Sequence, residues 1–200
     1  MLKPSINDIL WDKLINCNSK MTSLRTGTVY DDKCSSYTVS IMGNECIINL
    51  KEKKITGFNL NTSDFYNEFE LLILSYMINA KDVVTEDRWI SEKEIPGGNM
   101  FFTGPHKLSD KEIIEQFGKD AASFTNACKK INGKSIDYGD ATFAFTILPK
   151  IPFACVLWEE DDEFPSRVTF LFDTSIKYIL PLDTVIALVN TFIRILIQRF

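Results

Sequence analysis

The sequence of 200 residues contains a single histidine, His106, and this scarcity excludes several kinds of catalytic and metal site. Zinc enzymes commonly bind their metal through two or three histidines, so a site of that kind is not encoded. A serine hydrolase of the α/β type carries its nucleophile in a G-x-S-x-G turn, which the chain lacks. We therefore interpret His106, which follows Gly104-Pro105, as an ordinary residue of an exposed loop.

Cysteine is also sparse and widely spaced. The five cysteines form no C-x-x-C pair, which excludes a zinc knuckle and a thioredoxin-type redox pair. An iron–sulfur cluster would need a tighter grouping of thiolates. An odd number of separated cysteines fits a reducing compartment, and we expect a cytoplasmic protein.

No hydrophobic run is long enough to span a membrane. The most apolar segment, residues 185–200, is interrupted by Asn190, Arg194, Gln198 and Arg199. It is also shorter than the roughly 20 residues that a membrane-spanning helix requires, so it is expected to be a buried amphipathic helix. The N-terminal MLKPSINDIL contains no signal-peptide hydrophobic region. We expect no membrane partner.

Positive charge is never concentrated. The formal net charge is −5, and the longest basic stretch, Lys51-Glu52-Lys53-Lys54, contains an acidic residue. Nucleic-acid-binding proteins gather Lys and Arg on one face, because the phosphate backbone supplies most of the binding energy. The sequence therefore predicts no nucleic-acid partner.

Glycine is present in no nucleotide-binding motif. The segment Pro96-Gly97-Gly98 is glycine-rich, but neither G-x-x-x-x-G-K-[S/T] nor G-x-G-x-x-G occurs. Proline followed by glycine is typical of a tight turn. The functional alternative is that Gly97 and Gly98 form the hinge of a lid over a pocket.

The sequence does contain amphipathic segments of both helical and strand type. Apolar residues at helical spacing predict five helices, over about 6–16, 65–80, 109–118, 121–131 and 183–200. The capping residues expected are Ser5 for the first, one of residues 62–64 for the second and Ser109 for the third. Residues 22–28 are expected to be a polar loop.

Strands are expected in two blocks. Residues 37–41 and 46–50 are predicted to form a hairpin with Gly43-Asn44 at its turn, with a short strand at 54–56. Residues 141–148, 153–158 and 168–172 are predicted to form an antiparallel three-strand meander. Strands that are grouped, and do not alternate with helices, predict an α+β fold. We expect one domain over residues 1–200, in which about five helices pack against the N-terminal hairpin and the meander.

Residues 81–107 lack a regular pattern and are predicted to be a long loop that contains Trp89, Gly97 and Gly98. A loop of this length inside a compact domain is unusual and is often functional.

Five acidic residues in an unbroken row lie in the segment LWEEDDEFPSR, which runs from Leu157 to Arg167. On an extended strand Glu159, Asp161 and Glu163 would share one face and could offer carboxylates to Mg²⁺ or Ca²⁺. Crowded carboxylates repel one another, however, and solvent relieves the repulsion most simply. We therefore expect a solvated connector between two strands, in which a buried Glu163 would cap backbone N–H groups.

Three residues at the ends of predicted strands leave alternatives open. Trp158, which precedes the acidic row, is expected in the core or along a groove. Asp140 and Asp173 flank predicted strands, where capping of turns explains both. If the two strand ends met, these aspartates would form a carboxylate pair.

Several of these segments resemble a bacterial and archaeal family known as domain of unknown function 3786. The resemblance is carried by residues 147–153 (ILPKIPF), 157–165 (LWEEDDEFP) and 171–175 (LFDTS), with Ile95-Pro-Gly-Gly98 and Gly139-Asp140 as further parts. It covers most of the chain from about Phe69 to Asp183. The resemblance implies an origin in anaerobes. Some members of the family are fused to an iron–sulfur-cluster domain. The resemblance supplies no catalytic residue.

Three functional hypotheses follow. The first is a cytosolic non-catalytic module that binds a small ligand or a protein partner, with Trp89, Gly97, Gly98, Trp158, Asp161, Asp162 and Glu163 as candidate binding residues. It identifies no cofactor and assigns no metal ligand. The second is a metal-dependent enzyme that uses Asp161, Asp162 and Glu163 together with Asp173. The third, implied only by the family resemblance, is an accessory protein of anaerobic iron–sulfur or corrinoid metabolism.

Overall fold

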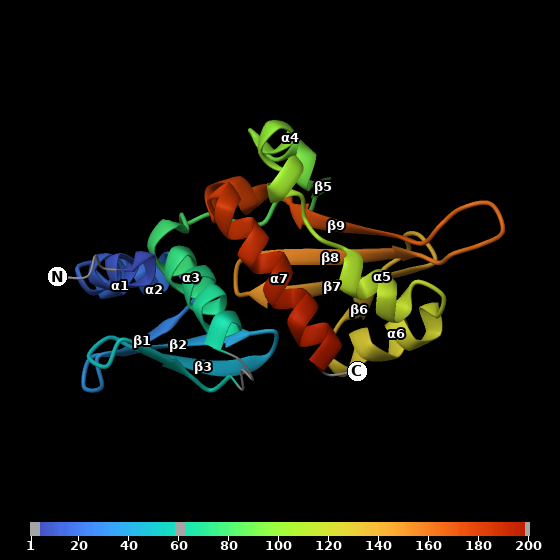
Figure 1. Ribbon diagram of the computed structural model, residues 1–200. Helices are drawn as coiled ribbons and strands as arrows, with labels where there is room; N and C mark the ends of the chain where they lie inside the picture. The colour runs from blue at the N-terminus through green and yellow to red at the C-terminus, as the bar shows by residue number, and fades with distance from the viewer. Residues whose placement is uncertain (1–4, 59–62, 199–200) are drawn as a thin grey trace.

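The protein contains two antiparallel sheets with helices packed between and around them, as seen in a computed structural model that describes residues 5–58 and 63–198. Figure 1 shows the smaller sheet at the N-terminal end of the molecule and the larger sheet beside it. The smaller sheet has the order β1-β2-β3-β4, with bounds Val29–Asp31, Ser36–Ile41, Asn44–Asn49 and Lys54–Thr56. The expected α+β class with antiparallel sheets is therefore confirmed.

The larger sheet has the order β5-β9-β8-β7-β6. Its bounds are β5 Trp89–Ser91, β6 Lys134–Ser135, β7 Ala141–Leu148, β8 Ile151–Trp158 and β9 Arg167–Asp173. The predicted meander is its centre, and the two short strands extend it on either side. Each neighbouring pair is antiparallel, and in the central meander this follows from the short connections that join β7 to β8 and β8 to β9.

Seven α-helices are described where about five were expected. They are α1 Ile6–Ile15, α2 Ser19–Thr26, α3 Ser63–Asn79, α4 Gly98–Phe101, α5 Lys111–Phe117, α6 Ala121–Lys130 and α7 Leu182–Gln198. Helices α5, α6 and α7 cover one face of the larger sheet, as Figure 1 shows. On α7, Phe192 lies 4.9 Å from Phe145 of β7 and 4.8 Å from Phe153 of β8, measured between ring centroids.

The C-terminal helix α7 is the buried amphipathic helix that the sequence predicts. Its leucine, valine and phenylalanine stripe lies in the core, while Arg194 is exposed. Within residues 5–58 and 63–198, no helix combines the length and the apolar character that a membrane span requires.

Several local predictions were wrong. Residues 22–28 are mostly helical, because Asn18 caps α2 by accepting a hydrogen bond from the backbone of Met21. The hairpin turn lies one residue earlier than predicted, at Met42-Gly43, where φ is 48° and 80°. Both values are positive, which is the type I′ geometry that matches the twist of paired strands.

The segment 81–107 is not one irregular loop. It contains β5, a 3₁₀ turn at Glu92–Glu94, the short helix α4 and a second 3₁₀ turn at Gly104–His106. The capping box predicted from Ser109 is also absent, since α5 begins at Lys111 with Asp110 at the N-cap position. The box predicted from Ser5 is present at α1. Thr62, one of the caps considered for α3, lies outside the described residues.

The C-terminal end of α3 is capped by an arginine from another helix. The guanidinium of Arg25 on α2 donates hydrogen bonds to the carbonyl oxygens of Met77 at 2.7 Å, Ile78 at 2.5 Å and Ala80 at 2.9 Å. The last carbonyls of a helix have no partner within the helix and carry partial negative charge. A cation at this position therefore joins α2 to α3.

Candidate functional site

Three side chains of different character lie next to one another across the end of the larger sheet. Trp158, the last residue of β8, pairs with Arg167, the first residue of β9. Asp140 immediately precedes β7, and its N–H donates to the carbonyl of Leu157 at 3.2 Å, which places it beside Trp158. An acid, an indole and a base therefore form one row over three neighbouring strands, which we call the Asp140–Trp158–Arg167 row.

The row lies on the face of the sheet opposite to α7. Phe145, Phe153 and Phe170 belong to the aromatic cluster that faces α7. Side chains alternate along a strand, and Trp158 is an odd number of residues from Phe153, as Arg167 is from Phe170. The row is thus directed away from the aromatic core.

The indole of Trp158 is held by contacts with two neighbours. The guanidinium carbon of Arg167 lies 4.0 Å from the ring centroid, a cation–π contact. The backbone of Gly139 approaches the indole closely, since a Cβ at this position would lie 3.2 Å from Cε2 of Trp158 and 2.8 Å from Cγ1 of Val156. Gly139 also has φ of 53°, which favours glycine. These contacts hold Trp158 in place, and its side chain is half-buried, which is intermediate between the core and the groove position that the sequence left open.

The acidic row forms the connector between β8 and β9, as predicted, and the strand alternation considered for it does not apply. One oxygen of Asp161 accepts hydrogen bonds from the backbone N–H groups of Glu163 at 2.8 Å and Phe164 at 2.7 Å. The cap predicted for a buried Glu163 is thus provided by Asp161, and Glu163 is exposed. An aspartate accepts such bonds readily because its short side chain reaches the backbone two and three residues ahead.

Two further carboxylates are fixed in the same way. One oxygen of Asp140 accepts the N–H of Glu159 at 2.8 Å. One oxygen of Glu159 accepts a hydrogen bond from the backbone N–H of Ala121, the first residue of α6, at 3.3 Å. For Asp140, Glu159 and Asp161 alike, the second oxygen has no hydrogen-bond partner among residues 5–58 and 63–198. Each of these carboxylates is held in place and still has an oxygen available as an acceptor.

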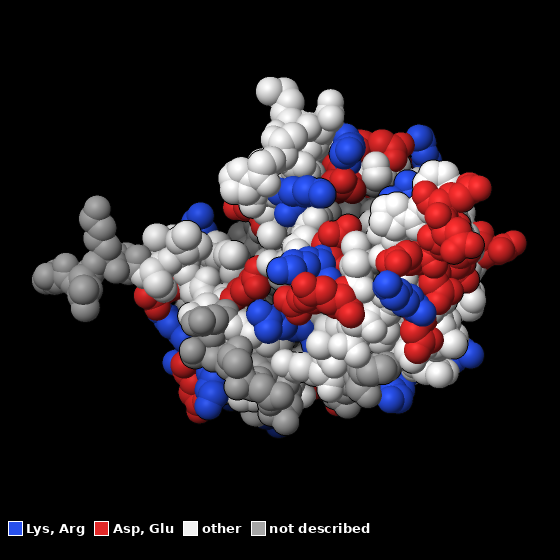
Figure 2. All heavy atoms as spheres, turned by 45° about the vertical axis from the view of Figure 1, so that its right-hand side comes forward, with Lys and Arg blue, Asp and Glu red and all other residues white. Residues whose placement is uncertain are grey.

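These groups surround a pocket of about 530 Å³, which we call the hairpin pocket. Phe164 is 66% exposed and forms an apolar part of its wall. The lining residues are Asp140, Trp158, Glu159, Asp161, Phe164, Pro165, Ser166 and Arg167. Figure 2 shows Asp and Glu side chains gathered at this end of the molecule. The pocket thus combines an apolar wall with an excess of negative charge.

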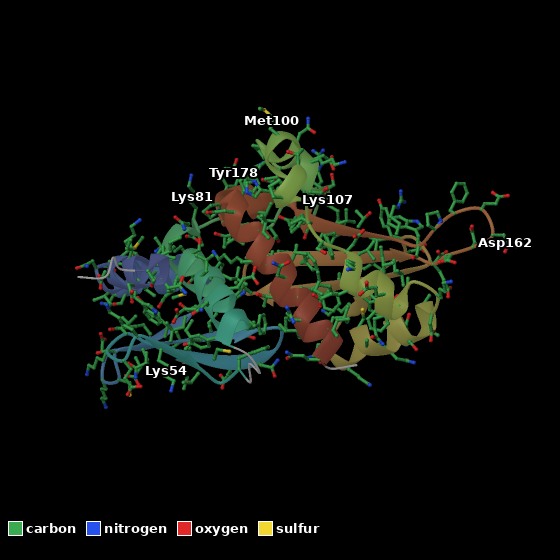
Figure 3. All side chains as sticks on the ribbon, in the orientation of Figure 1. Lys54, Lys81, Met100, Lys107, Asp162 and Tyr178 are labelled. Carbon is green, nitrogen blue, oxygen red and sulfur yellow. The ribbon has the colours of Figure 1, made fainter. Side chains whose placement is uncertain are left out.

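The remaining acidic residues of the connector do not line the pocket. Glu160 forms an ion pair with Lys119, 3.0 Å away, and its N–H donates to the carbonyl of Gly118. Asp162 lies at the outer end of the connector and is exposed, as Figure 3 shows. Of the four candidates in this segment, the structure brings Trp158 and Asp161 together and leaves Asp162 and Glu163 in solvent.

The other candidate residues lie elsewhere. Trp89 pairs with Asp173, at the opposite end of β9 from Arg167, and lines a separate pocket of about 230 Å³ beside the Met42-Gly43 turn. It is half-buried there. The candidate residues around Trp89 and those around Trp158 therefore lie in two distinct regions.

Gly97 and Gly98 shape the turn that begins α4. Gly97 has φ of 82°, and Gly98 is buried with its Cα against the carbonyl of Glu92, where no side chain fits. The N–H of Gly98 donates to the carbonyl of Ile95 at 2.7 Å. These contacts explain both glycines as parts of a tight turn.

Asp173 has a different role from the one that a metal site would give it. The residue is 3% exposed, and its carboxylate accepts hydrogen bonds from the backbone N–H groups of Glu86 at 3.0 Å, Arg88 at 3.3 Å and Ser175 at 2.9 Å. Burial raises the pKa of this carboxyl, but the hydrogen bonds from Ser175, Glu86 and Arg88 outweigh burial, so that its pKa is below the usual value. Asp173 holds residues 86–88 against the end of β9.

The acidic residues do not converge on one point. Asp173 is six positions along β9 from Arg167, a distance of about 20 Å at the rise of an extended strand. It therefore forms no pair with Asp140 and no joint site with Asp161, Asp162 and Glu163. Among the residues that the structure describes, no group of three or more His, Cys, Asp or Glu side chains is placed to hold a metal ion.

Arg167 is the charged residue of the pocket that the sequence analysis did not single out. Its signal was present, because a tryptophan that ends one strand and an arginine that begins the next are expected to pair in a hairpin. The pairing Trp158–Arg167 becomes visible only when both strand boundaries are known.

Comparison with known proteins identifies the family of this chain but no individual curated protein or solved structure. The family model described as "Domain of unknown function (DUF3786)" matches residues 19–195. No curated protein and no solved structure matches the chain. Since the model covers most of the sequence, the chain belongs to this family.

Proposed function

We propose that this member of the family is a non-catalytic protein that binds a small organic cation in the hairpin pocket. The observation that carries the proposal is the set of three carboxylates, Asp140, Glu159 and Asp161, each fixed by a backbone N–H and each with a second oxygen available as an acceptor. Carboxylates that are fixed in advance lose little freedom when they bind an ammonium group, which favours affinity.

The apolar wall supports an organic cation over an inorganic one. Phe164, Pro165 and Trp158 offer carbon surface beside the carboxylates. Ligand pockets typically combine such surface with a few oriented polar groups. A ligand with one ammonium group and one apolar group matches both parts of the lining.

We place this module in the cytoplasm. Support comes from the described cysteines, all of which are free thiols, as is usual in a reducing compartment. The negative charge around the pocket (Figure 2) supports a partner other than nucleic acid, since phosphates and carboxylates repel.

Isothermal titration of the full chain with 2-phenylethylamine and with its neutral isostere 2-phenylethanol tests the proposal. We expect the amine to bind at least about tenfold more tightly than the alcohol, a difference of about 1.4 kcal/mol. Its affinity should fall when salt is raised from about 50 mM to about 500 mM, because counterions screen the carboxylates. Equal affinity of the two probes, or no binding of either, would contradict the proposal.

Matched variants locate the binding. Asp140→Asn keeps an oxygen for the N–H of Glu159 and removes one charge from the pocket, so it should weaken binding of the amine by about tenfold. Asp162→Asn removes the same charge from an exposed position outside the pocket lining and should leave binding nearly unchanged. An equal effect of both variants would show that only the overall charge of the connector matters.

A further inference from the structure

The guanidinium of Arg167 is oriented but not used within the protein. It stacks on Trp158 at 4.0 Å. It forms no ion pair and no hydrogen bond with any residue of 5–58 or 63–198, although three carboxylates line the same pocket. Trp158 lies on the strand between Asp140 and Arg167, and no ion pair joins these two residues. The N–H donors of a stacked arginine are therefore available to an external acceptor.

The spacing of the row fits a ligand that carries both charges. Neighbouring strands are about 4.8 Å apart, so the backbones at Asp140 and Arg167 are separated by about 10 Å. The nitrogen and the carboxyl carbon of an α-amino acid are about 2.5 Å apart. Charge-assisted hydrogen bonds of about 2.8 Å at each end extend this span to about 8 Å. The span of the ligand and the separation of the backbones are of the same order, and the side chains of Asp140 and Arg167 both line the pocket, so a molecule with an ammonium and a carboxylate on one carbon can contact both ends of the row.

From these observations we infer that the ligand is a zwitterion of amino-acid type. Its ammonium group binds to the carboxylates around Asp140, its carboxylate binds to Arg167, and its apolar substituent lies along Trp158 and Phe164. This inference rests on the proposed function, since it adds a second recognised group to a ligand whose cationic group is already assigned to the pocket. Arginine suits this role because its planar N–H fork matches the two oxygens of a carboxylate.

Three matched probes separate the contributions of the two charges. L-Phenylalanine carries both groups, 2-phenylethylamine lacks the carboxylate, and 3-phenylpropionate lacks the ammonium. In isothermal titrations of the full chain at about pH 7, where all three probes are in these charge states, L-phenylalanine should bind at least about tenfold more tightly than 2-phenylethylamine. 3-Phenylpropionate should bind most weakly, because three carboxylates repel it.

Variants assign the carboxylate of the ligand to Arg167. Arg167→Gln should reduce the affinity for L-phenylalanine to that for 2-phenylethylamine, while the affinity for 2-phenylethylamine is unchanged or increased. The control is Lys119→Gln, which removes a cation that pairs with Glu160 outside the pocket lining and should preserve the preference for L-phenylalanine. Circular dichroism of each variant checks that it is folded, and the second variant Arg167→Lys, which keeps the charge but loses the fork, should retain only part of the preference.

The possible failures are distinguishable. Equal affinity for L-phenylalanine and 2-phenylethylamine overturns the zwitterion and leaves the proposed function intact. A preference for L-phenylalanine that persists in folded Arg167→Gln also overturns the role of Arg167. If neither probe binds, the inference and the proposed function fail together.

Discussion

Replacing the buried carboxylate of Asp173 should destabilise the protein strongly, because three backbone N–H groups depend on it. In Asp173→Ala the N–H groups of Glu86, Arg88 and Ser175 lose their acceptor at a position that is 3% exposed. A hydrogen bond to a charged group contributes about 1.5–3 kcal/mol, and part of the loss is recovered where residues 86–88 can move and reach water. We expect the free energy of unfolding to fall by about 3–5 kcal/mol.

The isosteric variant should cost less. In Asp173→Asn the amide oxygen can occupy the position of Oδ1, which accepts from Glu86 and Ser175, while the NH₂ group faces the N–H of Arg88. Two bonds are weakened and one is lost, which corresponds to about 2–3 kcal/mol and is less than the loss expected for Asp173→Ala. The matched control is Asp162→Asn, an exposed position where a change of less than about 0.5 kcal/mol is expected.

Urea unfolding at about pH 7, followed by circular dichroism, measures these differences, and thermal unfolding checks them. For a chain of this size each kcal/mol shifts the melting temperature by about 2–4 °C, so Asp173→Ala should melt roughly 6–20 °C below the parent protein. A loss no larger than that of the Asp162 control would refute the structural role of Asp173.

The pH dependence gives a second, independent check. The pKa of Asp173 is lowered in the folded state, so between the folded and unfolded values the unfolded chain binds the proton. The contribution of this carboxylate is therefore fully present above about pH 5 and is lost as the pH falls through the folded value, below about 3.8. The stability gap between the parent and Asp173→Asn should narrow from pH 5 towards pH 3. A gap that widens on acidification would show that the folded state does not favour the ionised form.

Three other predictions concern the remaining parts of the molecule. Gly139→Ala should destabilise the protein by at least about 1 kcal/mol, since φ is positive at this position. It should also change the fluorescence of Trp158, because the new methyl group meets the indole, and an unchanged emission spectrum would contradict the packing. Arg25→Met should lower the free energy of unfolding by about 2–4 kcal/mol, because the carbonyls at the end of α3 lose a charged donor. A change below about 0.5 kcal/mol in urea unfolding would rule out this cap. Burial raises the pKa of the Cys46 thiol to about 12. At about pH 8 a thiol reagent should therefore label the exposed Cys34 in the native protein and Cys46 only after unfolding, and equal labelling rates of the two in the native protein would refute the burial of Cys46.

The amphipathic segments of the chain were predictable because their pattern reflects burial on one face. The stripe of α3 and the alternating residues of the central meander follow from this rule, and so does the position of the acidic row in a connector. Helix α2 has no such stripe, since Met21 and Leu24 are exposed and mainly threonines face the core. It was missed because its stability comes from a cap and from Arg25, which contacts a helix about fifty residues away in sequence.

The sequence by itself determined the α+β class, the antiparallel pairing and the solvation of the acidic connector, since each depends on residues that are close along the chain. Only the tertiary structure decided which charged groups meet. Strand register placed Asp140, Trp158 and Arg167 in one row, and the length of β9 kept Asp173 about 20 Å from Arg167. The physical reason is that register is fixed by pairing between strands, so a shift of one residue would turn Trp158 and Arg167 to the opposite face and remove the pocket.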